Sequence, residues 1–235
     1  NIKAPDNEIQ ETLNVRDLWR ASPSGIIPVG LSALASAGFF GVGTIYAIKS
    51  GLSISETAIF MTLFIGFGAL SQWPLGWLSD KIDRRKVILL CCAGVISICI
   101  VLAIFEFNTT AFLLINGLIG ASTLPLYSIG VAQTNDRLEP KQMISASGTI
   151  VLVYSVFAAL GPLTVSFFLS SFDQFGFLLF LGIVHITIAV IVLLMMFVHK
   201  DVEDTEQANF QVMTHRPSTV AMEVIAEEAI ESQTE

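Results

Sequence analysis

The densest set of chemically active side chains lies in one short stretch, Gly76–Lys86, between two long apolar segments. Six of its eleven residues are charged, and four of those six are lysine or arginine. Charges so close together offer ionic contacts rather than a reaction. They fit between two membrane spans only as a tight turn at the water interface, and their basic excess indicates the side of the membrane.

No other set of residues has the spacing of a catalytic or metal site. The sequence offers no nucleophile with a base, no carboxylate pair, no set of metal ligands and no glycine-rich phosphate loop. The three cysteines, Cys91, Cys92 and Cys99, lie in one apolar segment and are expected to be small apolar helix residues. We therefore expect no enzymatic activity, no cofactor and no metal.

Ionisable side chains are rare at membrane depth. Lys, Arg, Asp and Glu are absent from the middle of the apolar segments, where such residues usually mark ion or proton pathways. Glu106 lies at the outer end of its segment and is expected to be solvated. His185 lies well inside another segment, where a neutral imidazole bonded to a neighbouring helix is favoured over a proton carrier.

Uncharged polar residues recur at helical spacing along several apolar segments. Such faces serve either helix packing or an aqueous cavity, because packed membrane helices also favour small residues, Ser and Thr. Gln72, Asn116, Tyr127 and Tyr154 are costlier to bury and favour a cavity. The candidates for a substrate cavity are Ser36, Gln72, Asn116, Thr123, Tyr127 and Tyr154.

Gly161 and Pro162 interrupt one of the apolar segments. Proline removes a backbone hydrogen bond and is expected to kink the helix, while the glycine beside it allows close approach. The sequence leaves open whether this bend is a static packing feature or takes part in gating.

The composition places these residues in a membrane. Of the 235 residues, 53% are hydrophobic and only 14% are charged, whereas soluble domains carry about 25% charged residues. A soluble fold of this size could not bury so much apolar surface. The class is therefore an integral membrane protein, and nothing in the charge pattern suggests binding to nucleic acid.

Six apolar segments reach the length of about 20 residues that a membrane-spanning helix needs. Continuous apolar runs predict an all-α bundle rather than a β-barrel, whose strands would show short alternating segments. The six expected spans are Gly25–Ile48, Glu56–Leu78, Val87–Phe107, Ala111–Ala132, Met143–Ser170 and Gly176–Val198.

The distribution of basic residues predicts the orientation. If the Gly76–Lys86 turn is cytoplasmic, both termini are cytoplasmic, and eleven basic residues lie inside against Lys49 alone outside. We therefore expect a multi-pass protein of the plasma membrane, specifically the inner membrane of a bacterium.

Two polar regions flank the predicted transmembrane domain of residues 25–199. Residues 1–24 resemble an internal linker, so we expect the chain to be part of a longer one. Within it, Asn14 is expected to cap a short amphipathic helix, with Leu18 and Trp19 in the membrane interface and Arg16 and Arg20 facing headgroups. Residues 200–235, with nine acidic and two basic residues, form an acidic cytoplasmic tail.

In this setting the pattern Gly76-x-Leu78-Ser79-Asp80-Lys81-x-x-Arg84-Arg85-Lys86 resembles the signature loop of the major facilitator superfamily. That loop joins the second and third helices of a six-helix half. The resemblance covers about residues 14–200. Asp83 stands where the pattern usually has a second glycine, and we expect it to alter the turn, because glycine permits a positive φ there.

The resemblance implies a fold and partners. The chain would be a six-helix bundle of two inverted three-helix repeats, and the C-terminal half of a twelve-helix secondary active transporter. Its partners would be the N-terminal half of the same transporter, the lipid bilayer and a small-molecule solute, with protons as a candidate coupling ion. The alternative is a self-sufficient six-helix protein that acts as a homodimeric channel or scaffold.

The resemblance also implies roles for residues. The gating loop would comprise Gly76, Asp80, Lys81, Arg84 and Arg85. Asp80 would hold a helix terminus or an arginine such as Arg84 in one state and release it in the other. In the family, the first, second, fourth and fifth helices of a half line the cavity. This favours the polar candidates above over Glu106 and His185, which lie on the third and sixth helices.

Overall fold

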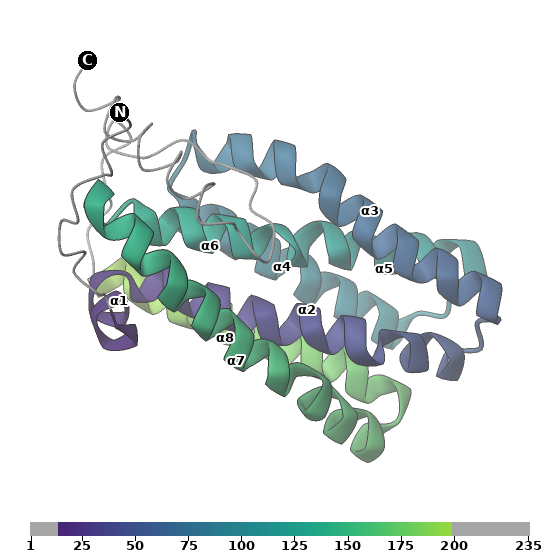
Figure 1. Cartoon of the computed structure of the whole chain (residues 1–235). Coiled ribbons are helices and arrows are strands. Elements are labelled where there is room, and N and C mark those ends of the chain that lie inside the picture. Colours follow the sequence, from purple (N-terminus) through teal and green to yellow (C-terminus); the bar gives the residue numbers. More distant parts are fainter. Residues whose placement is uncertain (1–13, 199–235) are drawn as a thin grey trace, which may run out of the picture.

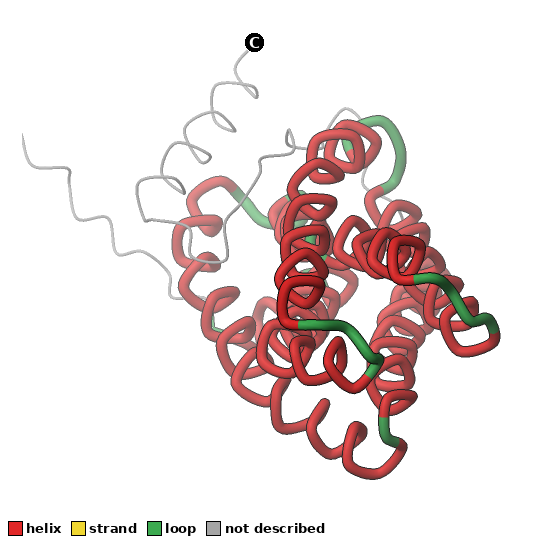
Figure 2. The backbone as a smooth tube through the Cα atoms, turned by 90° about the vertical axis from the view of Figure 1, so that its right-hand side faces the viewer, coloured by secondary structure: helices red, strands yellow, loops and turns green. Residues whose placement is uncertain are grey.

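The computed structural model describes residues 14–198, which form an elongated bundle of helices running side by side (Figure 1). Short loops join the helices at the two ends of the bundle (Figure 2). In chain order the helices are α1 (Val15–Ala21), α2 (Pro23–Lys49), α3 (Ile54–Ser79), α4 (Arg84–Ile104), α5 (Thr109–Thr123), α6 (Pro125–Asn135), α7 (Pro140–Phe172) and α8 (Gln174–Val198).

Six helical segments of this part of the chain are long and apolar enough to cross a membrane, with α5 and α6 together forming the fourth. The predicted all-α, six-span architecture is confirmed. The observed spans mostly extend a few residues beyond the predicted ones, because polar caps and charged first turns belong to the helices. Ser53 caps α3 through a capping box with Glu56, and Asn108 caps α5.

The predicted fourth span is confirmed as one segment of membrane length, Thr109–Asn135, although an interruption at Leu124 divides it into α5 and α6. Pro125 follows and has no N–H to donate to the carbonyl oxygen four residues earlier. The hydroxyl of Ser71 on α3 lies 2.7 Å from that oxygen, on Ala121, and donates to it. A side chain of a neighbouring helix thus satisfies the group that the proline leaves open.

The helix contacts follow the symmetry of two three-helix repeats. The most extensive packing joins α2 to α7, α3 to α5, and α4 to α8. The first repeat is α2, α3 and α4, and the second is α5–α6, α7 and α8. If each span is exchanged for its counterpart in the other repeat, the α2–α7 contact becomes the α5–α3 contact, and the α4–α8 contact stays the same. Because each repeat has an odd number of spans, the second repeat enters the membrane from the opposite side, as in inverted-repeat transporters.

Two glycines allow these repeats to approach closely. A Cβ atom at Gly120 of α5 would collide with the backbone of Phe64 on α3. A Cβ atom at Gly161 of α7 would lie 2.6 Å from the carbonyl oxygen of Leu34 on α2. α7 continues through Pro162, whose ring packs against Gly41 of α2, so this pair lies at a tight contact between helices.

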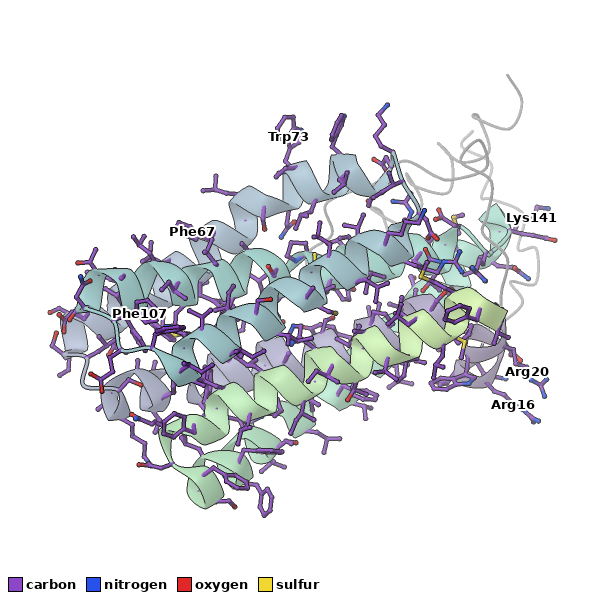
Figure 3. The ribbon with its side chains drawn as sticks, turned by 180° about the vertical axis from the view of Figure 1, so that it is seen from behind. Arg16, Arg20, Phe67, Trp73, Phe107 and Lys141 are labelled. Carbon is purple, nitrogen blue, oxygen red and sulfur yellow. The ribbon has the colours of Figure 1, made fainter. Side chains whose placement is uncertain are left out.

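α1 lies at one end of the bundle. Asn14 caps it with a capping box that includes Asp17, as the sequence predicted. The expectation for Leu18 was wrong, because its side chain is fully buried against the bundle. Trp19 is exposed, and Arg16 and Arg20 point away from the bundle at the end that also carries Lys141 (Figure 3).

Candidate functional site

Arg84 is the centre of the charged cluster predicted from the sequence. It is the first residue of α4, and its side chain is fully buried. Its Nη1 atom donates to Asp80 Oδ1 at 2.9 Å and lies 3.0 Å from Ser79 Oγ. A guanidinium can be buried in this way only where several acceptors surround it.

Asp136 is the second carboxylate partner of Arg84. Arg84 Nε donates to Asp136 Oδ2 at 2.7 Å, and the Asp136 side chain is only 2% exposed. Asp136 caps the C-terminus of α6, so this ion pair ties the turn between α3 and α4 to the end of the fourth span. Asp136 was not among the residues selected from the sequence. Its signal was a carboxylate four residues after the end of a predicted span, on the same side of the membrane as Gly76–Lys86.

Asp83 does not act as a substitute for a positive-φ glycine. Its φ is −46°, and its side chain accepts from the backbone N–H of Arg85 at 2.9 Å, which makes it the N-cap of α4. Its carboxylate also pairs with the Arg85 guanidinium at 2.8 Å. Asp83 therefore needs no positive φ here and serves as a helix cap, while the expected difference from a glycine-bearing turn stays a prediction.

The remaining basic residues divide into buried and exposed ones. Arg85 is buried, whereas Lys81 and Lys86 are exposed. Gly76 is buried, and its carbonyl oxygen accepts from Ser79 Oγ. Burial lowers the pKa of Arg137, Arg85 lowers that pKa further, and Asp83 and Asp136 act in the opposite direction.

The geometry of the cluster suits an ionic latch. Asp136 is a buried, fixed partner of Arg84, whereas the Asp80 side chain is 28% exposed at the edge of the cluster. A partly exposed carboxylate can exchange partners at lower cost than a buried one. Asp80 is therefore the more accessible of the two carboxylate partners of Arg84.

The six cavity candidates are distributed over five helices, α2, α3, α5, α6 and α7. Tyr127 and Tyr154 pack edge to face, with ring centroids 5.0 Å apart, and link α6 to α7. Thr123 is buried and donates to His185 Nε2 at 3.3 Å, while His185 Nδ1 donates to Leu181 O. Tyr127 of α6 thus contacts α7, and Thr123 of α5 contacts α8.

The other three candidates lie apart. Ser36 is buried on α2. Asn116 is fully buried and donates to its own helix at Phe112 O. Its Oδ1 atom, like Oε1 of the partly exposed Gln72, has no hydrogen-bond partner among residues 14–198. Their place on a substrate path remains a prediction.

The family model and the curated relatives that match this chain all point to one family. Residues 28–227 match the Major Facilitator Superfamily, which is most of the chain. An uncharacterized MFS-type transporter, YcaD, of Escherichia fergusonii is 23% identical over 163 residues, covering 68% of this chain and 42% of the relative. YcaD of Escherichia coli O139:H28 is 24% identical over 144 residues, covering 61% of this chain and 37% of the relative. The chain thus spans less than half the length of these curated relatives.

Proposed function

The chain belongs to the Major Facilitator Superfamily, a family of transporters and not of enzymes, and from this premise we propose its role. It forms the C-terminal six-helix half of a secondary active transporter that moves a small molecule by alternating access. The whole transporter contains two such halves, which rock about a central site. The observation that carries this proposal is the buried Arg84 with its partly exposed partner Asp80 at the end of a multi-pass helix bundle.

Two features support a missing partner half. More than half the length of the curated relatives lies outside the matched region, which is room for a second bundle. α3 and α7 have few fully buried residues, 22% and 17% of their most apolar windows, whereas the corresponding windows of α2 and the α5–α6 span are 67% buried. The N-terminal half of the same transporter would cover part of these two faces.

The orientation and location are proposed from the charge distribution. Arg16, Arg20 and Lys141 lie at one end of the bundle, and Phe107 lies at the other (Figure 3). The basic end faces the cytoplasm, in a bacterial inner membrane, consistent with the bacterial relatives. The predicted acidic tail, residues 200–235, lies outside the described residues.

The gating step follows from the geometry of the latch. In the state with a closed cytoplasmic side, Asp80 completes a contact that includes Arg84 and the facing half. When the halves separate on that side, Asp80 loses this contact, while Asp136 keeps Arg84 neutralised and in place. The loop therefore changes partners without leaving a buried charge unpaired.

We expect Asp80→Asn to lower the initial transport rate of the full-length protein by about tenfold. A hydrogen bond to a charged group contributes about 1.5–3 kcal/mol, and losing it in only one state shifts the balance of states by that amount. The solute is first identified with vesicles under an imposed pH gradient and a panel of neutral and charged small molecules. The initial rate at which that solute is transported is then compared between the Asp80→Asn variant and the parent protein.

Glu56→Gln is the matched control for this prediction. It makes the same change from carboxylate to amide at the opposite end of α3, where the side chain takes part only in the helix cap. It should leave transport unchanged. An Asp80→Asn protein that is present at the normal level and transports at the parental rate would contradict the gating role.

The upstream reading frame separates a transporter half from a self-sufficient channel or scaffold. We expect the in-frame sequence before Asn1 to encode six further apolar spans. A stop codon directly upstream, together with a homodimer in detergent, would instead favour the alternative.

A further inference from the structure

We propose that a groove at the α1 end of the bundle binds an anionic phospholipid. One acyl chain lies in the groove, and the phosphate lies on Arg16 and Arg20. This lipid site is separate from the Arg84 cluster and from the proposed transport path. It rests on a cavity, on the pattern of α1 and on the position of both at the edge of the membrane.

The groove is a cavity of about 480 Å³ with a wholly apolar wall. Its volume lies within the range of about 300–1,000 Å³ that is typical of ligand sites. The one hydroxyl in its lining, on Thr187, donates to Ile183 O of its own helix and so presents its methyl group. The wall includes Val15, Trp19, Leu152, Val156, Thr187 and Ile191.

The sequence of α1 places an apolar stripe beside a basic one. Val15 and Trp19 are four residues apart and line the groove. Arg16 and Arg20 form the next stripe along the same helix, because residues four apart share a face. Both arginines are exposed and point away from the bundle (Figure 3). A molecule whose tail touches the first stripe can therefore place its headgroup on the second.

The groove faces away from the side of α7 that packs on α6. Tyr154 packs on Tyr127 of α6 and marks that side. Leu152 and Val156 each lie two residues from Tyr154, which is about 160° around the helix. Both are more than half exposed, at 56% and 52%. The groove therefore opens on the side of α7 opposite to Tyr154. We assign this side to the surrounding membrane, and the Tyr154 side to the part of α7 that the N-terminal half would cover.

The charge of the α1 surface favours an anionic headgroup. Asp17 is the one carboxylate of this helix, and it is occupied by the capping box, where it accepts from the backbone N–H of Asn14. Within residues 14–198 neither the Arg16 nor the Arg20 guanidinium takes part in an ion pair. Trp19 beside them is an amphipathic ring of the kind that lies at headgroup depth. A phosphate with no compensating cation is the best match.

Fluorescence quenching tests the proposal. Every tryptophan of the full-length protein except Trp19 is replaced by phenylalanine, including the exposed Trp73 and Trp77. The protein is placed in phosphatidylcholine nanodiscs that contain a minor fraction of acyl-brominated phosphatidylglycerol or acyl-brominated phosphatidylcholine. We expect the anionic lipid to be enriched beside Trp19 by about fivefold for each arginine.

Three variants identify the source of the quenching. Arg16→Gln with Arg20→Gln should abolish the preference for the anionic lipid. Lys81→Gln removes an exposed basic residue that does not line the groove, and it should preserve the preference. Val156→Phe narrows the groove and should reduce quenching by both lipids.

Each other result would overturn the proposal. Equal quenching by the two lipids would show only a general contact with the bilayer. Weak quenching by both would show that protein, either another part of the chain or a second copy, covers the groove. An equal loss of preference in Lys81→Gln would assign the effect to surface charge in general. Unchanged quenching in Val156→Phe would place the acyl chain elsewhere.

Discussion

Arg84→Gln is expected to destabilise the protein more than any other single change in the charged cluster. Glutamine can keep one of the hydrogen bonds, but it removes the positive charge that contacts the carboxylate of Asp136, which is 2% exposed. Removing one partner of a buried ion pair costs about 3–5 kcal/mol. The thermal unfolding midpoint in detergent should fall clearly. It can be followed with a thiol-reactive dye, because Cys91, Cys92 and Cys99 are buried.

Two further variants separate the buried pair from a general effect of charge. Lys86→Gln removes an exposed charge two residues away and should change the unfolding free energy by less than about 0.5 kcal/mol. Arg84→Gln combined with Asp136→Asn should recover part of the lost stability, because no buried charge is then uncompensated. If Arg84→Gln unfolds at the same temperature as Lys86→Gln, the central role of Arg84 is wrong.

In this site, the contacts that could be predicted are those between residues close together in the sequence. Asp80 and Arg84 are four residues apart around a tight turn, so their contact at 2.9 Å follows from the spacing and the family pattern. The Arg84–Asp136 pair joins residues 52 positions apart, and no periodicity indicates which loops of a bundle meet. Asp83 shows a third case, where the pattern suggested a special backbone angle and the structure uses a helix cap.

The spans themselves were predictable because membrane helices leave a strong signal, a continuous apolar run of sufficient length. The break at Leu124 was also present in the sequence as Leu124-Pro125, but its consequence depends on Ser71 from another helix. Leu18 was assigned to the membrane interface by its helical pattern alone. It is buried because α1 packs on α2 and α7 as well as facing the membrane.

The polar stripes were less informative. A polar face at helical spacing fits both a packed interface and an aqueous cavity, and the two differ only in what lies opposite. Thr123 meets His185, which is 62 residues away, and Tyr127 meets Tyr154. Under the proposed function, the opposite wall of the cavity would belong to the N-terminal half of the transporter. The cavity role of these residues stays a prediction.

Gly120→Ala is expected to weaken the bundle at the contact between α5 and α3. The added methyl group would collide with the Phe64 carbonyl, and a backbone atom cannot turn aside as a flexible side chain does. Overpacking of a tight interface costs about 1–3 kcal/mol. The methyl group would push apart two helices of different repeats. The thermal midpoint in detergent and the yield of folded protein should both fall.

Gly66→Ala makes the same chemical change on α3 at a position where a Cβ atom meets nothing within 4 Å. Alanine is favoured over glycine inside a helix by about 0.5–1 kcal/mol, because glycine loses more backbone entropy on folding. The two variants should therefore shift the unfolding midpoint in opposite directions, upward for Gly66→Ala and downward for Gly120→Ala. An upward shift in both would mean that helix propensity, rather than the approach of α5 to α3, determines the effect. The close packing of the two repeats at Gly120 would then not be required for stability.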